Sequence, residues 1–279
     1  MADDGASRPF FAKRGNGIRQ ERMKTILLIG IGAGNPDHLT VQAIEALNAA
    51  DVFFVVDKGA RTADLIRLRE DICARFIRQP RYRVAAIADP KRDRAPADYL
   101  AAVDTWHQER AEAYAAAIER ELEDGQTGAF LVWGEPALYD STIRILDRVL
   151  AQGRTAFEYR VIPGISAVQA LTAAHRIPLN TIGGAVHVTT GRRIAEAVAT
   201  GADTIVVMLD DGSSLEGFPR QDFDIFWGAY LGTPDEVLVS GPASEVTGDI
   251  LRLRAERRAA KGWIMDSYLL RRRAGPFSG

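Results

Sequence analysis

Three short loops carry glycine and proline directly after strand-like segments. The loops are Gly30-Ile31-Gly32-Ala33-Gly34-Asn35-Pro36-Asp37, Trp133-Gly134-Glu135-Pro136-Ala137-Leu138-Tyr139 and Pro163-Gly164-Ile165-Ser166-Ala167. Glycine allows a ligand or a neighbouring backbone to approach closely. Ligands of open α/β sheets bind outside the carboxyl ends of the strands. We therefore expect the three loops to line a small-molecule site, with Ser166 also capping a helix.

The first loop has two interpretations. It resembles the glycine fingerprint of dinucleotide-binding proteins, and Asp57 ends the next strand where a ribose-binding acid would stand, about 20 residues further on. A dinucleotide loop, however, turns directly into a helix whose N-terminal amides hold the pyrophosphate. Here Asn35-Pro36-Asp37-His38 intervene before Thr40, the expected helix cap. An NAD-dependent oxidoreductase is therefore the weaker alternative.

Strand and helix patterns alternate along residues 23–177, which predicts a parallel sheet with helices on both faces. The continuous apolar run TILLIGIG is typical of a buried parallel strand. Beyond this region, the segments AVHVTTG, TIVVMLD, DIFWGAYLG and EVLVSGP predict a second sheet. We expect an α/β fold with a parallel-sheet N-terminal domain (23–177) and a mixed-sheet C-terminal domain (178–279). Residues 1–22 lack periodicity, and we expect a flexible extension there.

Helices must position the loops between these strands. The predicted helices span residues 41–50, 61–79, 95–124, 141–150 and 166–176. In the long helix 95–124, the spacing of the apolar residues marks one buried side. That side carries Leu100, Val103, Tyr114, Ile118 and Leu122.

Composition excludes several classes of protein. Lys and Arg number 35 against 37 Asp and Glu, so no overall positive field attracts nucleic acid or an anionic membrane. No apolar run reaches the roughly 18 residues of a transmembrane helix. The single cysteine, Cys73, is expected to be an apolar filler, and it favours a cytoplasmic protein. No His, Cys and Asp cluster has metal-ligand spacing, so we expect no metal.

At the three loops the chain resembles the tetrapyrrole (corrin and porphyrin) methyltransferase family. GIGAGNPDHLT matches the opening glycine motif of that family, and IPGISA matches its Pro-Gly-Ile/Val-Ser loop. WGEPALYDS matches its Gly-Asp-Pro loop, with Glu135 in place of the usual Asp. TIVVMLD and YLGTPDEVLVSGP match second-domain strands, and the resemblance covers about residues 23–270. Each motif alone is weak, but four in the same order are specific.

The resemblance implies two α/β domains, S-adenosylmethionine (SAM) folded between them, and a homodimer. The matched cofactor contacts are Ala33, Trp133, Gly134, Glu135, Leu138, Ser166, Ala167, Leu209 and Gly232. Relatives that act on an earlier tetrapyrrole place an acid–base Asp at the end of the second strand, which corresponds to Asp57 here. Glu135 has an alternative role, because its carboxylate could instead brace its own loop by hydrogen bonds.

The implied substrate is a small-molecule tetrapyrrole, precorrin-5, methylated at ring carbon C-1 with release of acetate. Deacetylation requires water to add to a carbonyl, which a base near neutral pH assists. Asp57, Tyr139 and His38 are candidates by loop position. The carboxylates of the substrate favour basic partners, above all the arginine fork. Lys58, Arg61, Arg192 and Arg193 follow strand ends and are our candidates for that role.

Other functions remain open at this point. The same fold serves methyltransferases that act on other precorrins, on ribosomal RNA or on proteins. The balanced charge and the absence of an arginine–aromatic stripe disfavour RNA. A non-catalytic tetrapyrrole or nucleotide binder is the remaining alternative.

Overall fold

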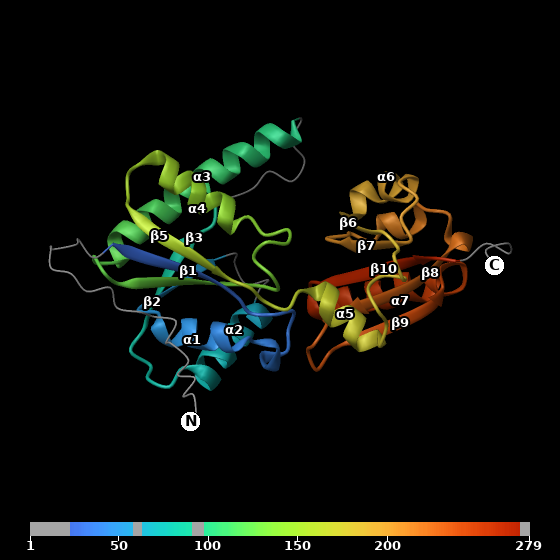
Figure 1. The fold of residues 1–279 in the computed structure, drawn as a ribbon, viewed down its shortest axis with the longest axis horizontal. Coiled ribbons are helices and arrows are strands. Elements are labelled where there is room, and N and C mark those ends of the chain that lie inside the picture. The colour runs from blue at the N-terminus through green and yellow to red at the C-terminus, as the bar shows by residue number, and fades with distance from the viewer. Residues whose placement is uncertain (1–22, 58–62, 91–97, 274–279) are drawn as a thin grey trace, which may run out of the picture.

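The computed structural model describes residues 23–57, 63–90 and 98–273. They form two five-stranded sheets with helices, one from each half of the chain, lying side by side (Figure 1). The predicted α/β fold with a parallel and a mixed sheet is confirmed. Within the described residues, no helix has both the length and the apolar character needed to cross a membrane.

The first sheet is entirely parallel, in the order β3-β2-β4-β1-β5. Its strands are β1 (Lys24–Gly30), β2 (Val52–Asp57), β3 (Arg83–Ala88), β4 (Thr127–Val132) and β5 (Phe157–Ile162). A dinucleotide-binding sheet places its first strand beside its second, whereas here β4 lies between β1 and β2. The strand β3 was not predicted, because it is an edge strand of small residues whose side chains are mostly exposed.

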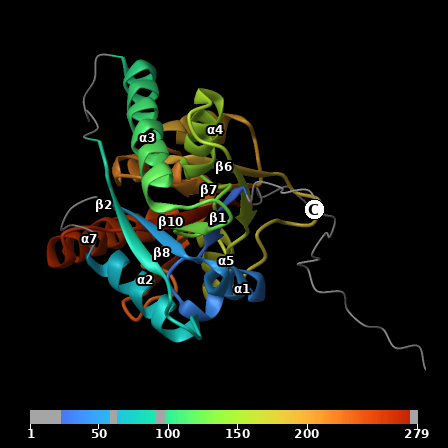
Figure 2. The same ribbon diagram turned by 90° about the vertical axis from the view of Figure 1, so that its left-hand side faces the viewer.

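Helices cover both faces of this sheet, as the apolar run in β1 predicts (Figure 2). Alternate residues of a strand point to opposite faces. Ile26 and Leu28 therefore pack toward α3 (Tyr99–Glu121) and α4 (Thr142–Gln152). Leu27 and Ile29 pack toward the other two helices, α1 (Val41–Ala49) and α2 (Ala63–Phe76).

The second sheet is mixed, in the order β6-β7-β10-β8-β9, with β6 and β7 parallel and the other pairs antiparallel. Its strands are β6 (Val186–Thr190), β7 (Thr204–Met208), β8 (Phe223–Ala229), β9 (Val237–Pro242) and β10 (Asp266–Arg272). The central strand β10 was not predicted. Its neighbours in the sheet come from segments far away in the sequence, so local patterning gives little sign of its central position.

Two kinds of packing surround the second sheet. One face is covered by α6 (Ile194–Ala199) and α7 (Ala243–Lys261). The other face packs against α5 (Ala167–His175), and this contact continues into the first domain through Ala33. Although α5 falls within the predicted N-terminal domain, its buried side packs on the second sheet. The boundary at residue 177 stays a prediction.

Candidate functional site

The three loops meet through their backbones at the carboxyl end of the first sheet. Gly32 and Gly134 form an antiparallel bridge, in which Gly134 N donates to Gly32 O at 2.9 Å and Gly32 N donates to Gly134 O at 3.3 Å. Because the bridge uses main-chain atoms only, it fixes the first two loops relative to each other whatever their side chains do.

Glycine is required where the third loop joins them. A Cβ on Gly30 would lie 2.5 Å from Gly164 N, and a Cβ on Gly164 would lie 2.2 Å from Gly134 O. Both distances are below any ordinary carbon contact. Gly134 differs, because it has a positive φ of 69° but faces open space. The first two glycines thus serve loop packing, whereas Gly134 leaves one side of its loop open to a ligand.

Glu135 braces this assembly. Gly164 N donates to Oε2 at 2.7 Å, and Ala137 N donates to Oε1 at 2.9 Å. One oxygen therefore ties the second loop to the third, and the other stabilises the turn itself. Both carboxylate oxygens are engaged by backbone amides, which is the bracing role considered from the sequence. A contact between Glu135 and the cofactor stays a prediction.

Ser166 is committed to capping α5. Its Oγ accepts from Val168 N at 3.1 Å, and its own backbone N donates to Gln169 Oε1 at 3.1 Å. This is a capping box, which satisfies two amides at the start of a helix. The predicted cap is confirmed. The buried Ser166 side chain is therefore already occupied by the helix.

The insert in the first loop contacts the second domain. A Cβ on Gly34 would lie 2.6 Å from Leu231 O, and a Cβ on Gly232 would lie 2.9 Å from Asn35 N. The insert forms a short 3₁₀ helix, η1 (Pro36–His38), before α1 begins. At α1 itself, Thr40 Oγ1 accepts from Ala43 N at 3.0 Å, as predicted. This loop therefore joins two domains rather than presenting the amides of α1 to a pyrophosphate.

A small cavity of about 20 Å³ lies at the junction of the domains. Three predicted cofactor contacts, Ala33, Trp133 and Ala167, line it together. Leu138 packs against the same junction cluster, and Gly232 follows Leu231, another lining residue. The structure thus gathers most of the predicted cofactor residues around one point.

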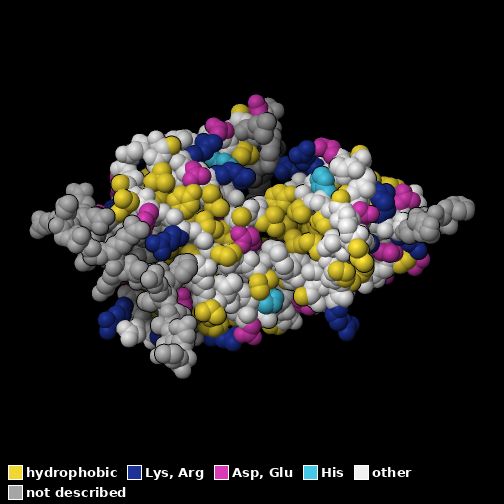
Figure 3. Space-filling view, viewed as in Figure 1, with side chains coloured by type: hydrophobic (Ala, Val, Ile, Leu, Met, Phe, Trp, Pro, Cys, Tyr) yellow, Lys and Arg dark blue, Asp and Glu magenta, His cyan; other side chains and the backbone are white. Residues whose placement is uncertain are grey.

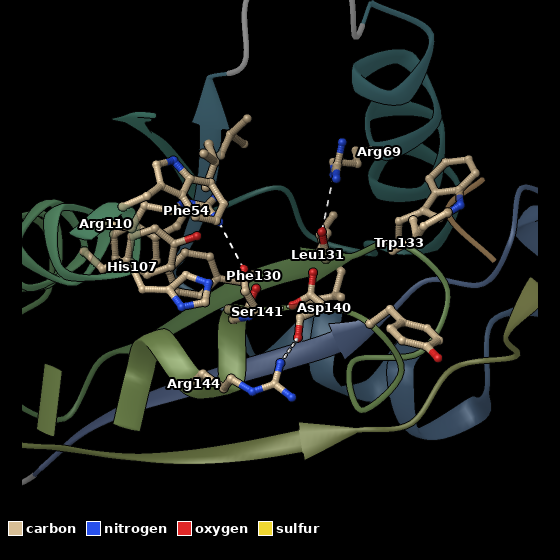
Figure 4. Close-up of a pocket in the computed structure, with 18 of the residues that line it drawn as sticks. Phe54, Arg69, His107, Arg110, Phe130, Leu131, Trp133, Asp140, Ser141 and Arg144 are labelled. Carbon is tan, nitrogen blue, oxygen red and sulfur yellow. Dashed lines mark hydrogen bonds between the residues drawn. The ribbon is translucent and has the colours of Figure 1, made fainter. Parts of the chain in front are cut away.

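A much larger cavity of about 570 Å³ adjoins the junction and shares Trp133 and Met265 with the small one. Its size is within the ordinary range for ligand pockets. Figure 3 shows a hollow between the two halves of the molecule, with basic and histidine side chains beside it. The polar and charged side chains of its wall include Arg69, His107, Arg110, Asp140, Ser141 and Arg144 (Figure 4). Trp106, Tyr139 and Leu209 also line it.

Three arginines give this cavity a positive character. Arg110 is buried, pairs with Asp89 at 2.8 Å and donates to Ser141 Oγ at 3.2 Å. Arg69 donates to Leu131 O at 3.4 Å, and burial lowers its pKa. Arg144 is exposed and donates to Asp140 O at 3.4 Å. Guanidinium groups at these positions suit an anionic ligand.

Two predicted residues at the cavity have unusual backbones. Tyr139 and Leu209 have φ values of 56° and 53°, in the left-handed region that side chains rarely adopt. Leu209 is 66% exposed, and Tyr139 Oη donates to Val188 O at 3.3 Å, across the domain junction. Burial raises the pKa of Tyr139. Such strained residues concentrate at functional sites.

Several predicted residues are not brought into the cavity. Arg192 and Arg193 lie in the exposed 3₁₀ helix η3 (Gly191–Arg193), where Arg193 pairs with Glu196. Neither arginine lines the large cavity, although Arg193 interacts with Tyr139 at its edge. His38 lines neither cavity, and its buried Nδ1 has no hydrogen-bond partner among the described residues.

Three other predicted residues lie wholly or partly outside the described part of the chain. Lys58 and Arg61 lie outside the described residues, as does the side chain of Asp57. The backbone of Asp57 ends β2 and is in register with Ala88. No group of three or more metal-ligating side chains occurs within the described ranges.

Sequence reasoning missed the polar residues that α3 contributes. Val103 and Tyr114 were predicted on its buried side, and Trp106, His107 and Arg110 lie on that same side between them. Spacings of three and four residues place side chains on one helix face. The missed signal was therefore a histidine and an arginine interrupting an apolar face.

Comparisons with known proteins agree with this geometry. The sequence model of the Tetrapyrrole (Corrin/Porphyrin) Methylases matches residues 25–247. A precorrin-6A synthase [deacetylating] from Sinorhizobium sp. is 52% identical over 252 residues, 90% of this chain and 97% of the relative. A precorrin-2 C(20)-methyltransferase from the same source is 30% identical over 54% of this chain and 58% of the relative.

Solved structures show the same fold. The crystal structure of a cobalamin synthesis related protein (CobF) from Corynebacterium diphtheriae has a TM-score of 0.78 and 39% identity, covering 90% of this chain and 99% of that one. A uroporphyrin-III C-methyl transferase from Thermus thermophilus, complexed with S-adenyl homocysteine, has a TM-score of 0.52 at 16% identity. It covers 88% of this chain and 91% of its own. The second similarity concerns the fold alone.

Proposed function

Since the chain belongs to the tetrapyrrole (corrin/porphyrin) methylase family, we propose that it is a SAM-dependent C-methyltransferase of cobalamin biosynthesis. In this proposal it acts as a precorrin-6A synthase, methylating precorrin-5 at C-1 and releasing acetate. The observation that carries the proposal is the 52% identity to a deacetylating precorrin-6A synthase over 97% of that relative. The arginine-lined cavity supports it, because a tetrapyrrole of this class carries many carboxylates.

The residues around the two cavities fit SAM. Apolar side chains such as Trp133, Leu231 and Met265 suit an adenine ring, and the open side of Gly134 exposes backbone to the polar ends of the cofactor. The junction cavity has room for about one water molecule. Most of the space for the cofactor must therefore come from the large cavity. Bound SAM would supply an activated methyl group on a sulfonium.

The protein contributes mainly position to this reaction. Holding two reactants in line can supply about 7–11 kcal/mol of the barrier. In the proposal, the bridge between Gly32 and Gly134 and the brace from Glu135 fix the wall against which SAM lies. The cavity arginines bind substrate carboxylates, Arg144 being exposed to a large ligand. Arg192 and Arg193 stay candidates for carboxylate groups that extend beyond the cavity.

Two further parts of the proposal concern the whole protein. We infer a homodimer from the family resemblance and a cytoplasmic location from the single cysteine, Cys73. An NAD-dependent oxidoreductase is not favoured, because β4 separates β1 from β2 and the first loop contacts the second domain. Methylation of a different precorrin is the remaining alternative within the family.

Thermal unfolding with added ligands tests the cofactor. A ligand that binds only the folded state stabilises it by RT ln(1 + [L]/Kd), about 2.7 kcal/mol at a hundred times Kd. We expect stabilisation by SAM and by its demethylated product, and none by NAD. If NAD stabilised the protein and SAM did not, the proposal would be overturned.

Incubation with precorrin-5 and SAM tests the substrate. We expect the tetrapyrrole to gain a methyl group and lose an acetyl group, with one acetate released per turnover. Methylation without release of acetate would support the methyltransferase assignment and contradict the deacetylating activity. The mass of the tetrapyrrole and the acetate concentration must be followed in the same reaction.

A further inference from the structure

One histidine lies in the large cavity without a role in the methyl-transfer site just described. His107 is half-buried on α3, in the same cavity as Arg110 from its own helix and Ser141 and Arg144 from the start of α4 (Figure 4). Its ring lies 5.3 Å from that of Trp106, between centroids, and accepts or donates no hydrogen bond within the described part of the chain. A ring nitrogen of His107 is therefore available to a molecule in the cavity.

The surroundings of His107 keep it neutral. Burial lowers its pKa, and the nearby cations Arg148, Arg110 and Arg144 lower it further. Asp104 opposes this effect, but its carboxylate is paired with Arg148 on α4. A neutral imidazole can accept a proton near neutral pH, and the arginines beside it can hold an anion.

The other ionisable groups of the cavity are less suited to accept a proton. Asp140 Oδ1 accepts from Thr142 N, the first amide of α4, at 2.7 Å. Burial raises the pKa of Tyr114 to about 12, so that its hydroxyl keeps its proton. Burial also raises the pKa of Tyr139, whose hydroxyl donates to Val188 O at 3.3 Å. Among the described residues that line the cavity, His107 is the one histidine, and its neutral ring can accept a proton.

We propose that His107 is the general base that activates water to release the acetyl group, and that Arg110 and Arg144 hold the resulting oxyanion and the departing acetate. This inference rests on the proposed function and names the residues for its deacetylating half. It replaces His38 as the histidine candidate, because His38 lines neither cavity.

Deacetylation begins when water adds to the carbonyl of the acetyl group. His107 takes one proton from water, and the oxygen forms a bond to the acetyl carbonyl carbon, whose oxygen becomes negative. When the carbonyl re-forms, the bond between the acetyl group and the ring carbon breaks. Acetic acid leaves and loses its proton to solvent. The electron pair stays on the ring carbon, delocalised into the macrocycle, and would take the methyl group of bound SAM as the carbon–sulfur bond breaks and the demethylated product leaves. His107 then gives its proton to solvent and is neutral again.

The test compares His107→Gln and His107→Ala with the wild type in a single turnover of precorrin-5 and SAM. A general base contributes about 10²–10⁴-fold. We expect acetate release to fall by about 100-fold or more in both variants, while the Kd values of SAM and precorrin-5 change by less than about threefold. His187→Gln is the matched control, because His187 lies in β6 and lines neither cavity.

Two readouts separate a catalytic base from a structural residue. Added imidazole should restore acetate release in His107→Ala, and the acid limb of the wild-type pH profile should vanish in His107→Gln. Acetate release within tenfold of the wild type overturns the proposal. A larger loss also overturns it when imidazole does not restore activity and the acid limb persists. Wild-type protein that binds SAM but releases no acetate would instead refute the proposed function.

Discussion

At the residue scale, the site depends on glycines, because a Cβ atom at these positions would collide with neighbouring backbone. Gly30 and Gly164 let three loops touch through their backbones, and Glu135 joins two of those loops with one carboxylate. A substitution here therefore acts on several loops together. The sequence predicts that these loop positions are functional, but the contacts between the loops are known only from the folded structure.

Replacing Gly164 with Ala tests this packing. The new Cβ would lie 2.2 Å from Gly134 O, a backbone atom that cannot move aside without shifting its loop. We expect a loss of about 2–3 kcal/mol in the free energy of unfolding, as for other overpacked sites, together with weaker SAM binding. Urea unfolding and calorimetric titration measure the two effects.

Gly248→Ala is the matched control for that substitution. Gly248 lies within α7 with no atom near its added Cβ. Alanine favours a helix interior over glycine by roughly 0.5–1 kcal/mol. The control should therefore be slightly more stable than the wild type. Equal stability of the two variants would contradict the close packing of the loops.

His107 should also affect how the free energy of unfolding depends on pH. Its pKa in the folded protein lies below the usual value of about 6.5. The unfolded chain therefore binds more protons as the pH falls below that value, and folding stability decreases. Above it both states are neutral, and His107 contributes nothing.

We expect the wild type to lose more stability than His107→Gln between pH 7.5 and pH 5.5. Comparing the two proteins removes the contribution of the carboxylates that they share. Urea unfolding at both pH values gives the difference. Parallel losses in the two proteins would mean that burial and the arginines do not depress the pKa of His107.

At the element scale, α7 is attached to the centre of the second sheet by one buried ion pair. Arg254 Nε donates to Asp266 Oδ2 at 2.8 Å, where β10 begins, and Trp227 Nε1 donates to the same oxygen at 2.8 Å. The guanidinium also donates to the carbonyl oxygens of Asp210 and Asp211, beyond the end of β7. One side chain thus joins α7, β10 and the loop after β7.

Arg254→Ala should be strongly destabilising. Removing one partner leaves Asp266 buried without its charge partner, which typically costs about 3–5 kcal/mol. Arg252→Ala on the same helix is the control, because Arg252 pairs only with exposed carboxylates. Such pairs contribute about 0–1 kcal/mol. Denaturant unfolding of both variants measures the contrast, and similar losses would argue against a buried anchor.

At the scale of the whole molecule, one apolar cluster joins the two domains. Val168 and Leu171 of α5 pack with Val206 and Leu269 of the second sheet, and Ala33 of the first loop belongs to the same cluster. The predicted cofactor residues surround this junction. Domain packing and the shape of the proposed site are therefore determined by the same contacts.

Leu171→Ala tests this coupling. Leu171 is fully buried, and truncating such a residue typically costs about 2–5 kcal/mol. We expect that loss together with weaker SAM binding, since the junction loosens. Ile182→Ala is the control, because Ile182 is fully exposed and should change stability by less than about 0.5 kcal/mol. Unchanged SAM affinity in Leu171→Ala would show that cofactor binding does not depend on the packing of the junction.

The fold class and the three loops could be predicted from the amino-acid sequence. Buried parallel strands need continuous apolar runs, and close loops need glycine, so both leave a local pattern. Thr40 and Ser166 were predicted as caps for a similar reason, because a cap bonds to residues only two or three positions away. The strands β3 and β10 were missed, since one is a mostly exposed edge and the other depends on distant partners.

Which side chains share the candidate site depends on the packing of the folded chain. Arg69, His107 and Arg144 come from three different helices, and no spacing in the sequence relates them. Arg192 and Arg193 follow a strand end as expected, yet they lie in an exposed turn outside the cavity. Local patterns are fixed by propensity and burial along one segment. The contents of a cavity depend on how helices from distant segments pack, which only the folded chain specifies.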